Sequence, residues 1–181
     1  MDNVACCFIG HRKIQDKEAV LPHVKAIVEM LIKEKGVRIF NFGSKSEFDD
    51  LCYAVVTEFQ NNFPDIIRVF YNRKSEYAVG KDEKANLEEI WSRLLKKDVS
   101  IKDCDSSKMS DRVFRAGKAS YVERNREMID DSDFCVFFYI EEYKPETELH
   151  RKSSGKSGTD IAYEYAVGKK KPIINVAELI R

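Results

Sequence analysis

The chain has 181 residues, of which 43% are hydrophobic and 34% are charged, a composition typical of one compact domain with a substantial core. Its 31 basic residues balance its 31 acidic residues, which argues against a duplex-binding protein because such proteins usually carry a strong positive excess. No apolar stretch has the length of a membrane span and no N-terminal segment has the pattern of a signal peptide. We therefore expect no membrane partner and a cytoplasmic location.

The five cysteines predict buried thiols rather than a disulfide framework. Cys6 and Cys7 are adjacent in an expected strand, so their side chains would point to opposite faces of it. No two cysteines have the CxxC spacing of a common metal site. We therefore expect a reducing compartment, no bound metal and no cofactor.

Apolar runs and helical spacing alternate along the chain. Glycines mark the ends of several elements, and Ser-x-x-acid boxes at Ser46 and Ser120 predict helix N-termini. The strands that these patterns predict are 4–9, 37–42, 66–71, 134–140 and 172–176, and the helices are about 20–32, 46–59, 120–131 and 157–167. Such alternation predicts an α/β fold with a doubly wound, mainly parallel, Rossmann-like sheet of about five strands and helices on both faces.

The alternation breaks after the third strand. Residues 72–119 are highly charged and contain one amphipathic helix with an apolar stripe around Leu87, Trp91 and Leu95. Residues 102–110 are polar and predict a loop. We interpret 72–119 as an insertion within a single domain that spans 1–181.

Ligands of open parallel sheets bind beyond the carboxyl ends of the strands, where the strand order reverses. In the expected topology this crevice lies between the first and fourth strands. The loops that follow those strands are Gly10-His11-Arg12 and 141–156. The second of these leads into the stretch SGKSGTD, which begins the next expected helix.

The letters GKS in that stretch do not form a P-loop. Such a loop needs a glycine where this chain has His150, and it follows the first strand directly. Backbone N–H groups of Ser157, Gly158 and Thr159 at the helix start could still bind a phosphate. The alternative is an ordinary cap, with Ser157 or Thr159 as the N-cap, and the charge of Asp160 would compete with a bound anion.

Further candidates lie on the loops and helix starts at the same edge. Arg12 and His11 could contact a phosphate or a ribose, with a solvated loop as the alternative. Asp49, beyond Gly43, could accept hydrogen bonds from ribose hydroxyls, although the capping box already explains it. Further candidates lie in the later helices, namely Arg124, Asn125 and Glu164. A surface ion pair with Glu127 or Asp131 is the alternative for Arg124, and an exposed face or a core contact would explain Glu164 as well as catalysis does. Asn is a poor helix former, so helix propensity does not explain Asn125.

Together these pieces resemble the SLOG superfamily, a Rossmann-like group that includes the LOG enzymes and DprA, and within it the YpsA-like branch of bacterial and phage proteins. The motifs that carry the resemblance are CFIGHR from Cys7, Phe42-Gly43 with Phe48-Asp49, ASYVERNREMI from Ala119, and KSGTDIAYEYA from Lys156. The resemblance implies a pocket for a nucleotide or a nucleotide-derived ligand. LOG enzymes cleave the N-glycosidic bond of nucleoside monophosphates, and Arg124 is similar in place to their arginine. Their glutamate and double glycine are not matched, since Ala162 stands at the glutamate position and Glu164 two places later.

Three hypotheses follow. The first is a domain that binds or senses a nucleotide-like ligand at the carboxyl edge of the sheet. The second is an N-glycosidic hydrolase or transferase in which Glu164 or Asp49 acts as the acidic group. The third gives the stripe around Trp91 a role as a homo-oligomer surface, with packing on the chain's own sheet as the alternative. We expect no nucleic-acid partner.

Overall fold

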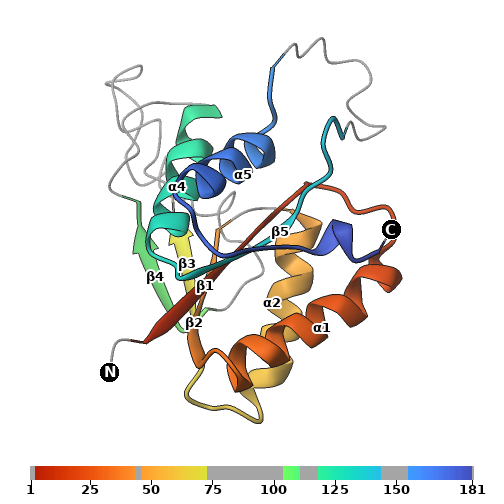
Figure 1. Ribbon diagram of the computed structural model, residues 1–181. Helices are drawn as coiled ribbons and strands as arrows, with labels where there is room; N and C mark the ends of the chain where they lie inside the picture. Colours follow the sequence, from red (N-terminus) through yellow and green to blue (C-terminus); the bar gives the residue numbers. More distant parts are fainter. Residues whose placement is uncertain (1–2, 44–45, 73–103, 111–117, 144–154, 181) are drawn as a thin grey trace, which may run out of the picture.

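A computed structural model describes residues 3–43, 46–72, 104–110, 118–143 and 155–180. Its sheet has six strands, all parallel, in the order β4-β3-β2-β1-β5-β6 (Figure 1). Their bounds are β1 (Val4–Gly10), β2 (Val37–Phe42), β3 (Ile67–Asn72), β4 (Ser106–Met109), β5 (Phe134–Phe138) and β6 (Ile173–Asn175). The expected mainly parallel, Rossmann-like sheet is thus confirmed, with six strands rather than about five.

Helices cover both faces of this sheet. In Figure 1, α1 and α2 lie together on one side of the strands, and α4 and α5 lie together on the other. Their bounds are α1 (Lys17–Lys33), α2 (Glu47–Gln60), α4 (Lys118–Asp130) and α5 (Gly158–Gly168), and a short 3-10 helix, η3 (Val176–Glu178), follows β6. The two strands at the centre of the switch, β1 and β5, contain no charged residue, as expected of strands that helices bury on both faces.

Two apolar cores flank the sheet. Cys6 and Phe8 belong to the core beneath α1 and α2, whereas Cys7 and Ile9 belong to the core beneath α4 and α5. The prediction that Cys6 and Cys7 point to opposite faces is therefore confirmed. The ring of Phe8 stacks on that of Phe42, with centroids 5.3 Å apart.

The strand order reverses at β1. From β1 the chain continues outward on one side through β2 and β3, and β5 and β6 lie on the other side. Because all strands are parallel, β1 and β5 end at the same edge, and Gly10 pairs in register with Phe138. The place where the crevice was expected, between the ends of β1 and β5, is therefore the topological switch point of the sheet.

One expected loop is a strand. Residues 102–110 predicted a loop, but Ser106–Met109 forms β4 at the edge of the sheet, paired with β3. Arg68 of β3 holds the strand's start, because its guanidinium donates to both carboxylate oxygens of Asp105 at 2.9 and 3.1 Å. Lys108 ties the strand to α4 through Asp131 at 2.5 Å. An edge strand with polar side chains has no apolar run, and for this reason the polar sequence of residues 102–110 wrongly predicted a loop.

The capping box expected at Ser120 is wrong. The helix already includes Lys118, and Ser120 is a fully buried residue inside it. Glu123 pairs instead with Arg126 one turn further along, at 2.8 Å. The capping box at Ser46 is half confirmed, since its hydroxyl accepts from the N–H of Asp49 at 3.1 Å.

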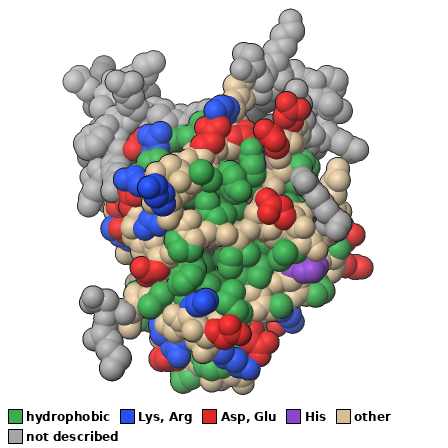
Figure 2. Space-filling view, viewed as in Figure 1, with side chains coloured by type: hydrophobic (Ala, Val, Ile, Leu, Met, Phe, Trp, Pro, Cys, Tyr) green, Lys and Arg blue, Asp and Glu red, His purple; other side chains and the backbone are tan. Residues whose placement is uncertain are grey.

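Two predicted features lie outside the residues that the structure describes. The amphipathic stripe around Trp91 belongs to residues 73–103, and His150 belongs to residues 144–154. Within the described part of the chain, no helix has the length and apolarity that crossing a membrane requires. Figure 2 shows hydrophobic side chains across the middle of one face, with acidic and basic side chains around them.

Candidate functional site

The loop after β1 and the start of α5 lie at the same edge of the molecule. The N–H of His11 donates to the carbonyl of Phe138 at 3.2 Å, which extends the β1–β5 ladder past Gly10. Asp160, in the first turn of α5, lies close enough to His11 to act on the charge of its ring. Figure 1 shows the carboxyl ends of β1 and β5 beside the N-terminal ends of α2 and α5.

Gly10 is required by packing. A Cβ atom at this position would lie 2.5 Å from Cδ1 of Phe48 and 2.7 Å from its Cβ, closer than any real contact. The missing side chain lets the first turn of α2 rest directly on the end of β1. Gly10 therefore brings α2, and Asp49 with it, to the switch point.

His11 fastens two strand ends together. Its ring is buried, and Nε2 accepts a hydrogen bond from the N–H of Ile140 at 3.0 Å. The ring also stacks on Tyr143, with centroids 4.5 Å apart. Burial lowers the pKa of His11 below its ordinary value of 6.5, so the imidazole is neutral at pH 7. These contacts make His11 a link between the β1 and β5 loops.

Arg12 extends from a loop that is firmly held. Its side chain is exposed, and its carbonyl accepts from the N–H of Glu47 at 3.0 Å. The carboxylate of Glu47 in turn accepts from the N–H of Ile14 at 2.9 Å and pairs with Lys13 and Lys17. These bonds lower the pKa of Glu47 to about 2. The loop thus presents Arg12 to solvent from a fixed backbone.

A buried polar cluster lies where β2 ends. Asp49 is 0% exposed, Arg124 4% and Asn125 6%. The N–H of Gly43 points to Oδ1 of Asp49 at 3.5 Å. A Cβ on Gly43 would lie 3.1 Å from Nε of Arg124 and 2.7 Å from the sulfur of Met128. Gly43 therefore lets α4 approach the end of β2 closely. We call Gly43, Asp49, Arg124 and Asn125 the edge cluster.

The edge cluster contains side chains of opposite charge, Asp49 and Arg124, which are both buried beside Gly43. Arg124 donates to Oδ1 of Asn125 at 3.2 Å, and its guanidinium lies 5.5 Å from the ring centre of Tyr121. Burying a guanidinium and a carboxylate costs free energy that their attraction often fails to recover. Buried charged groups at a strand's carboxyl end are therefore candidates for a functional site.

The start of α5 has the ordinary cap that the sequence left open as the alternative to an anion site. Ser157 is the N-cap: its hydroxyl accepts from the N–H of Asp160 at 3.1 Å, and Asp160 accepts from the N–H of Ser157 at 2.5 Å. The first hydrogen bond within the helix is donated by Ile161 to Ser157 at 3.2 Å. The N–H groups of Gly158 and Thr159 precede it, so the helix itself gives them no acceptor. They are the donors available to an anion here.

Glu164 lies apart from the edge cluster. Its carboxylate pairs with Lys156 at 2.5 Å, and its side chain is 53% exposed on α5. Asp49, the other acidic candidate, is fully buried on α2. The structure thus brings together Gly43, Asp49, Arg124 and Asn125, and it leaves the side chains of Arg12 and Glu164 in solvent.

Aromatic residues that were not among the predicted site residues complete this edge. Tyr139 stacks on Tyr163 with ring centroids 4.2 Å apart, which joins the end of β5 to α5. Tyr143 covers the ring of His11. The sequence signal for them is weak: Tyr139 and Tyr143 follow an apolar strand four positions apart, and Tyr163 lies in a later helix. Among the described residues, no three His, Cys, Asp or Glu side chains are grouped so as to hold a metal ion.

Comparison with known proteins adds no assignment, since neither a family model nor a curated protein matches the chain.

Proposed function

We propose that the carboxyl edge of the sheet binds a nucleotide or a nucleotide-derived ligand. The observation that carries the proposal is Arg124, a guanidinium only 4% exposed, held against Gly43 in the edge cluster at the sheet's switch point. A parallel sheet receives ligands at this edge. A buried arginine beside a carboxylate and an amide offers both a charge and hydrogen-bonding groups to a polar ligand.

The phosphate of this ligand is assigned to the start of α5. There the N–H groups of Gly158 and Thr159 lie outside the intrahelical bonds, and the helix dipole favours an anion. Arg12, exposed on the neighbouring loop, supplies a cation that can approach the same anion. The motifs that resemble the SLOG superfamily include both of these segments, which is a second reason to propose a nucleotide.

Calorimetric titration with nucleoside monophosphates, cyclic dinucleotides and NAD derivatives tests the proposal. For whichever compound binds, we expect Arg124→Gln to weaken affinity at least tenfold, because a charged hydrogen bond is worth roughly 1.5–3 kcal/mol. Arg126→Gln is the matched control: Arg126 lies on the same helix, but it is only half-buried, where it pairs with Glu123 and lies over the ring of Tyr165. Absence of binding across the whole panel, or equal losses in both variants, would refute the proposal.

A matched pair at Gly158 tests the phosphate's position. Proline is accepted at the first residue of a helix and removes one N–H, whereas alanine keeps it. Ser157 already has the extended backbone, φ −68° and ψ 167°, that a following proline requires. We expect Gly158→Pro to bind phosphate-bearing ligands about tenfold more weakly than Gly158→Ala. Equal affinities would remove the phosphate from the start of α5.

Cleavage or transfer at the N-glycosidic bond is the second candidate function. It is favoured by the carboxylate of Asp49 in the same edge cluster as Arg124. Release of free base from any nucleotide that binds would support it, provided that Asp49→Asn or Glu164→Gln abolishes the release. If both variants bind the nucleotide and no base is released by the wild type, binding alone remains.

A further inference from the structure

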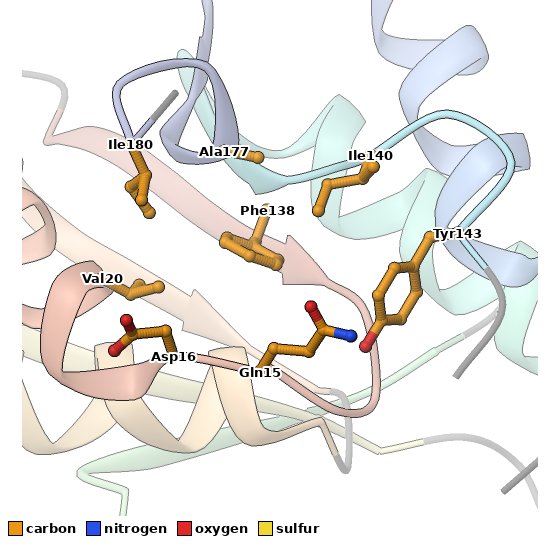
Figure 3. A pocket seen from close by; sticks show the side chains of 8 residues that line it. All are labelled: Gln15, Asp16, Val20, Phe138, Ile140, Tyr143, Ala177 and Ile180. Atoms are coloured by element: carbon orange, nitrogen blue, oxygen red, sulfur yellow. The ribbon is translucent and has the colours of Figure 1, made fainter. Parts of the chain in front are cut away.

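A separate hollow of about 190 Å³ opens beside the start of α1. It lies between α1, the end of β5 and η3, on the sheet face opposite α5 (Figure 3). Its walls include Val20, Phe138 and Ala177, all of which are buried. The edge cluster and the start of α5 contribute no residue to its lining, so the proposed phosphate site does not account for it.

The size of the hollow matches one or two fused rings. An apolar cavity of about 150 Å³ in a protein is known to stay dry and to bind benzene. The walls here are aliphatic and aromatic, with Phe138 at the centre of the view in Figure 3 and Tyr143 at one side. A flat hydrophobic molecule would make more favourable contacts with such walls than the few water molecules that it displaces, because its apolar surface would leave water.

Hydrogen-bond acceptors lie at the rim. Figure 3 shows the amide of Gln15 beside the hydroxyl of Tyr143, and the carboxylate of Asp16 on the opposite side of the hollow, below Val20. Asp16 uses Oδ1 as the N-cap of α1, accepting from the N–H of Ala19 at 2.9 Å. Its second oxygen and the Gln15 carbonyl can accept from a ligand. The carboxylate also disfavours an anion, and the nearby Lys17 is paired with Glu47 at 3.0 Å.

The frame of the hollow is fixed by bonds that do not depend on a ligand. The side-chain amide of Asn175 donates to the carbonyl of Tyr139 and accepts from its N–H, both at 3.0 Å, which holds η3 against β5. The hydroxyl of Tyr143 donates to the carbonyl of Lys13 at 3.1 Å. A preformed site of this kind loses little conformational entropy when it binds.

We propose that this hollow is a binding site for a neutral aromatic molecule of one or two rings that bears a hydrogen-bond donor at its edge. The ring occupies the space between Val20, Phe138 and Ala177, and the donor faces Asp16. The site is independent of the proposed nucleotide site, because it uses other residues on the other face of the sheet.

Titration of the isotope-labelled protein with indole, followed by NMR, tests the site. We expect saturable shifts of the Phe138 and Ala177 signals with a dissociation constant of roughly 1 mM, as suits a ligand of this size. Ala177→Leu adds three carbon atoms to the hollow and should abolish the shifts. Leu179→Ala is the matched control, since Leu179 is on the same segment but is 50% exposed and outside the lining. If Ala177→Leu does not fold, Ala177→Val serves with a smaller expected loss of at least threefold.

A second variant isolates the donor. Asp16→Ser keeps an N-cap acceptor for α1 and removes the carboxylate. We expect it to weaken indole at least threefold and to leave toluene, which has no donor, unchanged. The site is disproved if the wild type shows no saturable shift with indole, or if the shifts persist unchanged in Ala177→Leu. Equal effects of Asp16→Ser on both probes would refute the role of the donor.

Discussion

Two glycines at the carboxyl edge of the sheet allow side chains of neighbouring helices to pack closely on the strand ends. Gly10 and Gly43 have no side chain, and in each case another helix occupies the space: Phe48 of α2 over Gly10, and Arg124 of α4 over Gly43. The sequence predicted both glycines as loop markers where a ligand could approach. It could not show that the neighbours are side chains of this chain, because such contacts join residues more than thirty positions apart.

Substitution of Gly10 should therefore be costly even without a ligand. We expect Gly10→Ala to lower the free energy of unfolding by about 1–3 kcal/mol, the usual cost of overpacking. Gly158→Ala is the comparison, because a Cβ there meets nothing within 4 Å, and it should change stability by less than about 0.5 kcal/mol. Urea unfolding of both variants measures the difference. Equal stabilities would mean that Phe48 does not rest on Gly10.

His11 gives the molecule a defined response to acid. Because burial lowers its pKa in the folded state, the unfolded chain binds the proton more readily. The stability that neutral His11 contributes is full above its ordinary pKa of 6.5 and is lost as the pH falls below that value. We expect the stability of the wild type to fall more steeply between about pH 6.5 and 5 than that of His11→Gln. Parallel pH profiles in thermal unfolding would contradict this.

At the scale of elements, the sequence predicted the apolar strands best. The strands β1 and β5 are uninterrupted apolar runs, and β2 and β3 are mainly apolar with one arginine and one asparagine each, so their apolar residues identify them. The edge strand β4 has the sequence Ser-Ser-Lys-Met, which has no such pattern. Its position depends on Arg68 and Asp105, whose pairing joins residues 37 positions apart. The capping box predicted at Ser120 was wrong for a similar reason, because the Ser-x-x-Glu pattern does not reveal that Ser120 lies buried inside the helix.

The Arg68–Asp105 pair makes a prediction about β4. The guanidinium of Arg68 lowers the pKa of Asp105 to about 2, and Asp105 also accepts from the N–H of Arg68 at 2.8 Å. We expect Asp105→Asn to cost about 1–2 kcal/mol and to speed amide hydrogen exchange in β4 while leaving β1 and β5 unchanged. The control is Asp65→Asn. Asp65 pairs with Arg38, but its side chain is 61% exposed, so the loss of this pair should change stability little. Unchanged exchange in β4 would show that the strand is held by other contacts.

At the scale of the whole molecule, a doubly wound sheet brings distant segments to one edge. The loop at Gly10, the edge cluster and the start of α5 come from four parts of the chain, and the strand order places them together. The sequence predicted this meeting because parallel strands and their reversal point follow from the alternation of elements. The sequence did not predict that Arg124 is buried while Arg12 and Glu164 are exposed. The burial of a side chain at this edge depends on which strand ends and helices pack around it, and the sequence pattern does not reveal that packing.

The central claim is that this edge binds a nucleotide through the start of α5 and the edge cluster. A crystal structure of the protein soaked with the tightest-binding compound from the calorimetric panel tests it most directly. The account predicts phosphate oxygens within about 3.2 Å of the N–H groups of Gly158 and Thr159, with the rest of the ligand contacting Arg124. A ligand bound elsewhere, with the start of α5 holding only water, would contradict it.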